Sequence, residues 1–372
     1  MKKGNIDKFF LTLVISLIVI GIIIFTSASL GILTKNEDKF YNVIFNQFIF
    51  GLGGGLIAFY LGYKIPYKFW RKYALYIFIF CIILTLLVFV PKLGVSHGGA
   101  KRWVDIFGYS FQPVEFLKIG FIIYFSAWLS WAKSKVKNFK YSILPFIILI
   151  GIVAGILVNQ PDTKSIILMT MTAIIMLFVS GVPIKYIIGL VICAIAGFVV
   201  LIFFKPYLLE RVYTFIDPSR DSQGSSYQLQ QSLIAIGSGG ITGRGLGQSI
   251  QKFNYLPEPQ GDSIFAVIGE EFGFIGCVLL IILYLLFTLR GYRIAYHSPD
   301  PFSKIFVIGI ISIIIFQSFM NIASIIGLFP LTGVPLVFIS HGGTALLLDM
   351  GLMGIILNIS QYQKKNSRSK EE

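Results

Sequence analysis

The chain has 372 residues, of which 56% are hydrophobic and only 13% are charged, and its apolar residues gather in blocks too long for a soluble core. This composition excludes a water-soluble domain and predicts a polytopic membrane protein. The formal net charge of +14 does not indicate nucleic-acid binding, because the basic residues lie in short loops between apolar blocks, where they set membrane orientation.

Ten apolar segments are predicted to cross the membrane as helices, which makes the protein all-α. They are residues 9–33, 44–63, 73–92, 111–132, 143–159, 165–181, 184–204, 263–289, 303–328 and 336–361. Continuous apolar runs favour helices over barrel strands, which would alternate in blocks of about ten residues. The first segment lacks a small-residue cleavage site followed by a soluble domain, so we expect a retained helix. Residues 1–363 are predicted to form one membrane domain, and 364–372 a charged, disordered cytoplasmic tail.

The distribution of Lys and Arg predicts that both termini are cytoplasmic. With that orientation, cytoplasmic segments carry 19 basic residues and the short outer loops carry 6. The long segment between helices seven and eight, about residues 205–262, is then external and balanced in charge. We expect it to fold onto the membrane, with a short amphipathic helix in YQLQQSLIAIG and a flexible segment in GSGGITGRGLG. The cysteines Cys81, Cys193 and Cys277 lie inside apolar spans without paired spacing, and are interpreted as small core residues.

The loop before the fourth span brings the first polar groups to the predicted external side. Glu115 and Lys118 are three residues apart in a helix that Pro113 can open, so they are close enough to pair. The pair is either a structural salt bridge or part of a substrate site. Lys101 and Arg102 could contact lipid phosphate, but basic residues on the outer face oppose the charge bias, which favours a diphosphate ligand.

Two further polar motifs occur at span boundaries on the same side. Asp162 and Lys164 stand in NQPDTKS, where Asp162 could instead be a helix cap. The last outer hairpin places four residues where a helix could expose backbone N–H groups to an anion: Ser340, His341, Gly342 and Gly343. A lone histidine at such a place is more often a packing residue than a catalyst.

The fourth motif contains Asp262, a carboxylate where the long polar loop becomes the eighth span. The bilayer edge is an unfavourable place for an idle charge, because desolvation opposes ionisation there. Asp262 is therefore the candidate catalytic acid or base. Glu270, Glu271 and Asp349 lie deeper in their spans and are expected to satisfy neighbouring helices.

The assembled groups suit an anionic lipid substrate. A carboxylate can remove a proton from an attacking hydroxyl while cations stabilise a departing phosphate. The sequence has no Ser-His-Asp or Cys-His set, no histidine cluster for a metal and no GxxxxGK[ST] loop, so ATP-driven transport is unsupported. A lipid-phosphate transferase, a lipid flippase and an ion-coupled carrier all stay open at this point.

Seven motifs in order carry a resemblance over nearly the whole chain. They are TSAS at 26–29, GAKRW at 99–103, FQPVEFLK at 111–118, NQPDT at 159–163, DPSRDSQGSSYQLQQSLIAIGSGG at 217–240, LPEPQGDSIFAVIGEEFGFIG at 256–276 and GLFPLTGVPLVFISHGG at 327–343. The chain resembles the SEDS family (shape, elongation, division and sporulation) of ten-span peptidoglycan glycosyltransferases. GLGQSIQKFNYLPE is more similar to its cell-division branch, FtsW, than to its rod-elongation branch, RodA. Four positions depart from the usual pattern: Val114, Lys164, Gly261 and His341.

The resemblance implies that the protein polymerises lipid II at the outer face of the bacterial cytoplasmic membrane, at the division septum. Asp262 matches the essential acid of the family and would act as general base for inverting transfer from a polyprenyl-diphosphate donor. The implied substrate and diphosphate residues are Lys101, Arg102, Lys118, Glu115, Gln160, Asp162, Ser340, His341, Gly342 and Gly343. A divalent cation such as Mg²⁺ is allowed, with Asp162 or Asp262 as its ligand. The implied partners are a single-span class B penicillin-binding protein and other division proteins, and the alternatives are rod elongation, a lipid II flippase and a silent scaffold.

Overall fold

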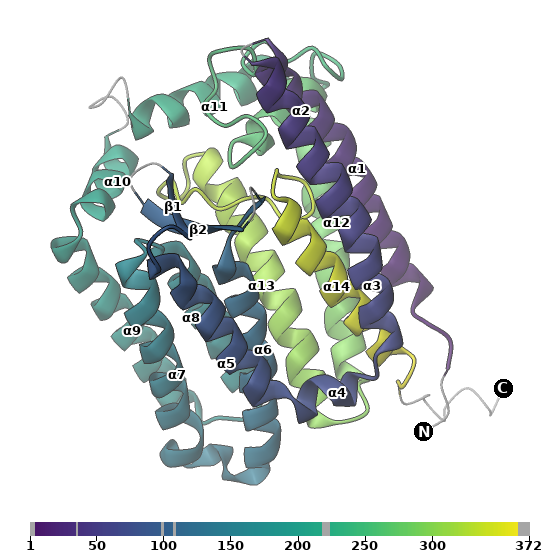
Figure 1. Cartoon of the computed structure of the whole chain (residues 1–372), viewed down its shortest axis with the longest axis vertical. Helices are drawn as coiled ribbons and strands as arrows, with labels where there is room; N and C mark the ends of the chain where they lie inside the picture. Colours follow the sequence, from purple (N-terminus) through teal and green to yellow (C-terminus); the bar gives the residue numbers. More distant parts are fainter. Residues whose placement is uncertain (1–3, 35, 98–99, 107–108, 218–223, 364–372) are drawn as a thin grey trace.

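Long apolar helices form most of the structure, which is a computed structural model describing residues 4–34, 36–97, 100–106, 109–217 and 224–363 (Figure 1). Within these residues, eight helical stretches are long and apolar enough to cross a membrane. They are Lys8–Leu33 (α1), Glu37–Lys64 (α2, a π-helical turn and α3), Pro113–Lys137 (α6 and a 3₁₀ turn), Phe139–Asn159 (α7), Ile184–Phe204 (α9), Ile264–Tyr296 (α12), Pro301–Ile325 (α13) and Gly343–Ser360 (α14).

Two shorter apolar stretches, Ala74–Phe89 and Thr163–Val179, lie where the third and sixth spans were predicted. The first contains α5 (Ala74–Leu86), which follows the short helix α4 (Tyr67–Lys72), and the second is α8. The mostly helical membrane fold is confirmed, while the count of ten spans stays a prediction. The predicted tail 364–372 lies outside the described residues.

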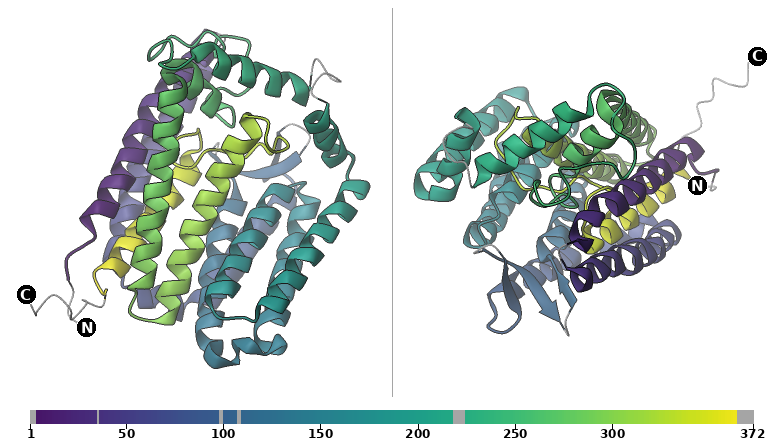
Figure 2. Two further views of the ribbon diagram at one scale, coloured as in Figure 1. Left: turned by 180° about the vertical axis from the view of Figure 1, so that it is seen from behind. Right: turned by 90° about the horizontal axis from the view of Figure 1, so that it is seen from above.

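Helix α13 occupies the middle of the bundle, where it packs against α6, α8 and α12 (Figures 1 and 2). Most of its side chains are buried, including Phe302, Phe306 and Ile310, which are fully enclosed. Helix α9 is the opposite case, because large apolar side chains such as Ile192 and Phe203 are 61% and 79% exposed. A helix with this exposed apolar surface is suited to contact with lipid tails.

The segment after α9 covers one end of the bundle, which we call the loop end. It contains α10 (Pro206–Ile216) and α11 (Ser225–Gly239) and then an irregular stretch that leads to α12 (Figures 1 and 2). Helix α11 confirms the helix predicted in YQLQQSLIAIG, whereas α10 was not predicted. The other end of the bundle is formed by short connections such as α4.

The glycine-rich stretch that was predicted to be flexible, residues 237–247, forms backbone hydrogen bonds to a break in α12. Helix α12 is interrupted at Gly273, whose φ of 64° suits glycine, and the interruption exposes backbone groups on both sides. Those groups pair with the glycine-rich stretch, through Phe274 N–H to Gly240 O (2.9 Å) and Arg244 N–H to Glu270 O (3.0 Å). The helix break and the loop therefore satisfy each other's hydrogen bonds.

A three-stranded antiparallel sheet lies at the loop end, as a small addition to the helical fold that the sequence did not predict. Its strands are β1 (Gly94–His97), β2 (Ala100–Ile106) and β3 (Tyr109–Phe111), in the order β1-β2-β3. Within β2, Val104 is fully buried and Lys101 is exposed. The strand is short, lies between apolar spans and has no regular alternation of apolar and polar residues, so its sequence was assigned to a loop.

The segment between α13 and α14 is irregular up to residue 342, although a helix was predicted from residue 336. Pro330 and Pro335 each lack a backbone N–H, and Gly333 has a φ of 65°, so this stretch is poorly suited to a continuous helix. We call residues 327–342 the α13–α14 segment. It lies against the end of the loop that carries Asp262.

Candidate active site

Asp262 lies directly before α12, on a backbone that is fixed at three successive carbonyl groups. The Asp262 carbonyl accepts a hydrogen bond from Asn321 Nδ2 at 2.7 Å, and the Gly261 carbonyl accepts one from Ser340 Oγ at 2.7 Å. The Gln260 carbonyl accepts the His341 backbone N–H at 2.8 Å. Helix α13 and the α13–α14 segment therefore hold the loop that presents this acid.

The Asp262 side chain is enclosed between α11, α8 and the α13–α14 segment. Its Oδ1 accepts a hydrogen bond from Gln228 Nε2 at 3.1 Å. A Cβ placed on Gly333 would lie 3.4 Å from Asp262 Oδ2, so the glycine leaves room for the carboxylate. Burial raises the pKa of Asp262 above its ordinary value, while the charge of Lys164 and the Gln228 hydrogen bond act in the opposite direction and Glu258 adds to the rise. A raised pKa suits a group that must accept a proton near neutral pH.

Three cationic side chains from three elements belong to the electrostatic cluster that includes this acid. Lys164 in α8 donates a hydrogen bond to the Gly333 carbonyl. Arg211 in α10 donates through Nη1 to the Thr332 carbonyl at 3.0 Å. The charges of Asp262 and Arg102 both act on Lys164 and on Arg211, which places all four groups in one electrostatic cluster.

Arg102 and Asp162 are brought together, as the sequence predicted. Arg102 Nε in β2 donates to the Gln160 carbonyl at 3.1 Å, and its Nη2 donates to the Pro161 carbonyl. Asp162 is buried and begins α8, but its Oδ2 accepts the Ser165 hydroxyl at 2.8 Å and makes no capping bond to the backbone. Its Oδ1 is buried without a hydrogen-bond partner among the described residues.

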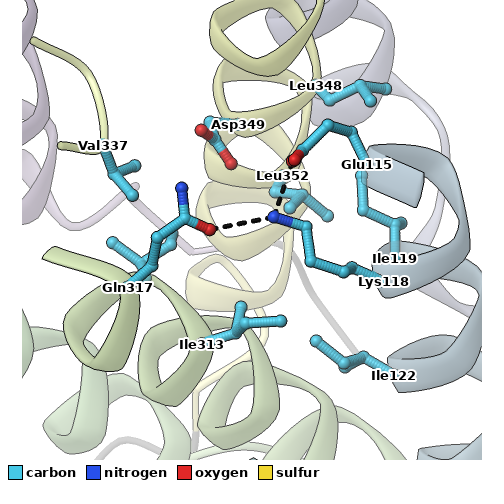
Figure 3. A pocket seen from close by; sticks show the side chains of 11 residues that line it. Glu115, Lys118, Ile119, Ile122, Ile313, Gln317, Val337, Leu348, Asp349 and Leu352 are labelled. Carbon is cyan, nitrogen blue, oxygen red and sulfur yellow. Dashed lines mark hydrogen bonds and ion pairs between the residues drawn. The ribbon is translucent and has the colours of Figure 1, made fainter. Parts of the chain in front are cut away.

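Glu115 and Lys118 form the predicted pair, with 2.7 Å between Lys118 Nζ and Glu115 Oε2. They face a small cavity between α6, α13 and α14, shown in Figure 3, where Lys118 also donates to Gln317 Oε1 at 2.9 Å. Asp349 points into the same cavity, which has room for about one water-sized molecule in 20 Å³. These contacts direct Lys118 into the cavity between the helices, and Lys118 is not among the groups that shift the pKa of Asp262.

The glycine-turn residues before α14 hold the site without offering free N–H groups. The Gly342 N–H donates to Gln47 Oε1 at 3.0 Å, and the His341 N–H is bonded to the Gln260 carbonyl, so the predicted exposed anion donors are wrong at both positions. Burial lowers the pKa of His341 to about 4, so its ring is uncharged at neutral pH. The ring stacks on Phe25 at 5.9 Å, as expected of a packing histidine.

The remaining predicted site residues, Lys101, Gln160 and Gly343, are not shown in contact with Asp262 by the hydrogen bonds that the described residues form. Lys101 is exposed on β2, Gln160 is buried and donates to the Thr85 carbonyl at 2.9 Å, and a Cβ on Gly343 would lie 2.7 Å from the Asn46 carbonyl. Gly343 therefore permits close packing of α14 on the π-helical turn Asn46–Gly53.

Glu270 and Glu271 face the loop rather than a substrate. Glu270 accepts hydrogen bonds from Ser249 Oγ at 2.5 Å and the Ile250 N–H at 2.9 Å. Glu271 lies 2.7 Å from Lys252 Nζ, and both side chains are fully buried. The expectation that these acids have a structural role fits this arrangement, although among the described residues their side-chain partners lie in the loop, apart from Ser27 in α1.

Sequence reasoning missed four groups around Asp262: Arg211, Gln228, Asn321 and Glu258. Contacts between distant segments identify Gln228 and Asn321, which are 34 and 59 residues from Asp262. Glu258 lies in the same loop as Asp262 but was given no role. Lys164 was noted beside Asp162 and as a departure from the family pattern, without an assigned role. Its basic charge beside Asp162 was the one available signal.

The donor set does not fit a divalent cation well. Among the described residues, no group of three or more His, Cys, Asp or Glu side chains could hold a metal ion. The charge of Lys164 acts on both Asp162 and Asp262, which are the two carboxylates considered as ligands. An ammonium group in this position already balances the negative charge that would attract Mg²⁺.

These features define a multi-pass membrane protein with a half-buried acid near basic side chains at one end of its helical bundle. The chain belongs to the cell cycle protein family of FtsW, RodA and SpoVE, which it matches over residues 7–365. The expected SEDS membership is therefore confirmed.

Curated relatives align over nearly their full length. The stage V sporulation protein E of Bacillus subtilis is 36% identical over 363 residues, covering 98% of this chain and 99% of the relative. A probable peptidoglycan glycosyltransferase FtsW of Geobacter sulfurreducens is 37% identical over 360 residues, covering 96% of both. Relatives from the sporulation and FtsW groups thus match at similar identity, and the branch stays a prediction.

Solved structures support the fold. A chain from the structure described as "Structural coordination of polymerization and crosslinking by a peptidoglycan synthase complex" is 26% identical, with a TM-score of 0.78 over 97% of this chain and 99% of that one. The rod shape determining protein RodA of Thermus thermophilus has a TM-score of 0.70 at 24% identity, over 96% of this chain and 98% of RodA. The RodA likeness concerns the fold alone.

Proposed function

We propose that this protein polymerises lipid II into glycan strands, with the loop end facing the outside of the cytoplasmic membrane. The observation that carries the proposal is Asp262, a half-buried carboxylate that is fixed through its backbone and shares an electrostatic cluster with Lys164, Arg211 and Arg102. A relative named as a probable peptidoglycan glycosyltransferase aligns over almost the entire chain. An acid with adjacent cations is the arrangement that transfer from a diphosphate-linked sugar requires.

Asp262 is the general base of the proposed reaction. It accepts the proton of the 4-hydroxyl of the acceptor sugar, and the resulting oxygen forms a bond to the anomeric carbon of the donor. The bond between that carbon and the diphosphate oxygen breaks, and its electron pair leaves with the diphosphate. Attack from the opposite side of the ring converts an α-linked donor into a β-linked glycan. Basic groups stabilise the charge that develops on the leaving diphosphate.

Membership of a complex with a class B penicillin-binding protein is part of the same proposal. A similar solved chain comes from a peptidoglycan synthase complex that coordinates polymerization and crosslinking. The proposed site of action is the division septum, supported by the FtsW relatives. Depletion of the protein followed by microscopy of septa and cell width separates this role from elongation.

The direct test uses purified full-length protein with its partner and labelled lipid II. We expect glycan polymer from the wild type and none from Asp262→Asn, which keeps the size of the side chain. Movement of lipid II between vesicle leaflets without polymer would instead support a flippase. Full polymerisation by Asp262→Asn would remove Asp262 from the mechanism.

A further inference from the structure

Three consecutive backbone carbonyls of the α13–α14 segment are each held by a side chain from a different helix. Arg211 in α10 donates to Thr332 O at 3.0 Å, and Lys164 in α8 donates to Gly333 O. Asn321 in α13 donates to Val334 O at 2.7 Å, while the same amide donates to the Asp262 carbonyl. We call residues 332–334 the carbonyl strap. The strap is connected to the backbone of Asp262 through the side-chain amide of Asn321. Its other two carbonyl oxygens accept hydrogen bonds from Lys164 and Arg211.

Gly333 lies between the Asp262 carboxylate and the two cations. A Cβ on Gly333 would lie 3.4 Å from Asp262 Oδ2 and 3.9 Å from Arg211 Nη2. Gly333 has a φ of 65°, and its carbonyl accepts the hydrogen bond from Lys164. A reacting group beside Asp262 would therefore be within reach of Lys164 and Arg211.

Lys164 and Arg211 form weaker hydrogen bonds to their present acceptors than they would form to an anion. Lys164 and Arg211 donate to neutral carbonyls of the strap, whereas charge-assisted hydrogen bonds to phosphate oxygens are roughly twice as strong. Neither side chain forms an ion pair within 4.0 Å among the described residues, unlike Lys118, Lys252 and Arg290, which are paired with carboxylates. Within the part of the chain that the structure describes, these two half-buried cations are hydrogen-bonded to carbonyl oxygens, which they can exchange for an anionic ligand.

We propose that Lys164 and Arg211 are the diphosphate-binding pair of this site, and that the diphosphate replaces the strap carbonyls as their hydrogen-bond acceptor. The inference rests on the proposed function, whose donor is a diphosphate-linked sugar. It assigns the diphosphate of that donor to Lys164 and Arg211, whereas the sequence had assigned it to Lys101, Arg102 and Lys118. The carbonyl strap then couples diphosphate binding to catalysis. When Lys164 and Arg211 bind the diphosphate in place of the strap carbonyls, the strap stays connected to the backbone of Asp262 through the hydrogen bonds of Asn321. Arg102, bonded to the Gln160 and Pro161 carbonyls, is a third cation at the edge of the pair.

Lys164 has a second consequence for the base. The charged or titratable groups that act on Asp262 are Lys164 from α8, Arg211 from α10 and Glu258 from its own loop, and Gln228 from α11 donates to its carboxylate. Of these, Lys164 is the largest influence that favours the ionised carboxylate. Loss of this cation should therefore move the acid limb of the activity profile to higher pH, because the base stays protonated further up the scale.

The experiment measures binding of farnesyl diphosphate, with uncharged farnesol as reference, to the purified full-length protein. We expect Lys164→Gln and Arg211→Gln each to raise the dissociation constant for farnesyl diphosphate about tenfold or more, without changing that for farnesol. Lys164→Arg keeps the charge and should retain binding to within about threefold. Lys92→Gln removes an exposed lysine from the loop before β1 and should leave both constants unchanged.

Three outcomes overturn the inference: unchanged binding in either glutamine variant, equal weakening for farnesol, or equal weakening by Lys92→Gln. A thermal melt of each variant checks folding, and rescue by Lys164→Arg assigns a defect to the lost charge. A polymerisation assay keeps the two proposals apart. Polymer formation with unchanged diphosphate binding in the variants refutes the pair alone, whereas pair-dependent binding without polymer from the wild type refutes the glycosyltransferase.

Discussion

The ion pair between Glu271 in α12 and Lys252 in the preceding loop is predicted to be the main contact that fixes this loop to the helical bundle. Both side chains are fully buried, with Lys252 Nζ 2.7 Å from Glu271 Oε1, 3.0 Å from Ser27 Oγ and 2.9 Å from the Gly247 carbonyl. Glu271→Gln leaves the ammonium buried without a counter-charge. Removal of one partner of a buried pair destabilises a protein by about 3–5 kcal/mol.

The double variant Glu271→Gln/Lys252→Met removes both charges and should be less destabilised than the sum of the single variants. We expect a coupling energy of about 2 kcal/mol or more, since neither single variant can satisfy the remaining charge. The pair Asp7 and Arg290 is the matched control, because Arg290 is 27% exposed although the atoms are 2.8 Å apart. Its coupling should be about 1 kcal/mol or less.

Thermal unfolding in detergent and limited proteolysis of residues 240–263 measure these effects. The loop should become susceptible to cleavage in Glu271→Gln before the helices unfold, because Glu271 and its neighbour Glu270 hold residues 249–252. Additive single and double variants, or an equal coupling in the control pair, would refute the assignment of Glu271 and Lys252 as the main anchor of the loop.

Further predictions concern Asp262 and its surroundings. Asp262→Asn should lower the polymerisation rate by about 10²–10⁴, as measured with labelled lipid II, and a rate within tenfold of wild type would exclude a general base at this position. Burial raises the pKa of Asp262, so the polymerisation rate should fall on acidification at a higher pH than it would with an ordinary aspartate. A pH series of the initial rate in Lys164→Gln should show this fall at a still higher pH. Gly333→Ala should lower polymerisation strongly, since a Cβ would meet Asp262 Oδ2 at 3.4 Å and a φ of 65° is strained for alanine by about 1–2 kcal/mol. Gly327→Ala has a similar φ of 76° without that contact, so an equal loss of activity in the two variants would attribute the effect to backbone strain alone.

The basic residues illustrate which parts of the site the sequence could predict. Arg102 and Asp162 were expected to meet at a span boundary, and Arg102 indeed bonds to the carbonyls directly before Asp162. Lys118 was expected in the same place on the basis of helix position and charge. Its hydrogen bonds to Glu115 and Gln317 instead direct it into an interior cavity, because rotamer and packing choose the direction of a long side chain. The place of Arg211 in the site could not be predicted, because its helix α10 lies in the long loop and is not an apolar span that hydropathy identifies.

The sequence by itself determined the membrane class and the order of the apolar helices, and it identified Asp262 as the candidate acid. These follow from hydrophobic length and from motifs, both of which are local along the chain. Only the tertiary structure decided which cations face Asp262, that the glycine-rich loop closes the break at Gly273, and that the α13–α14 segment is irregular. Such features depend on hydrogen bonds between residues far apart in sequence, and those bonds exist only once the helices have packed.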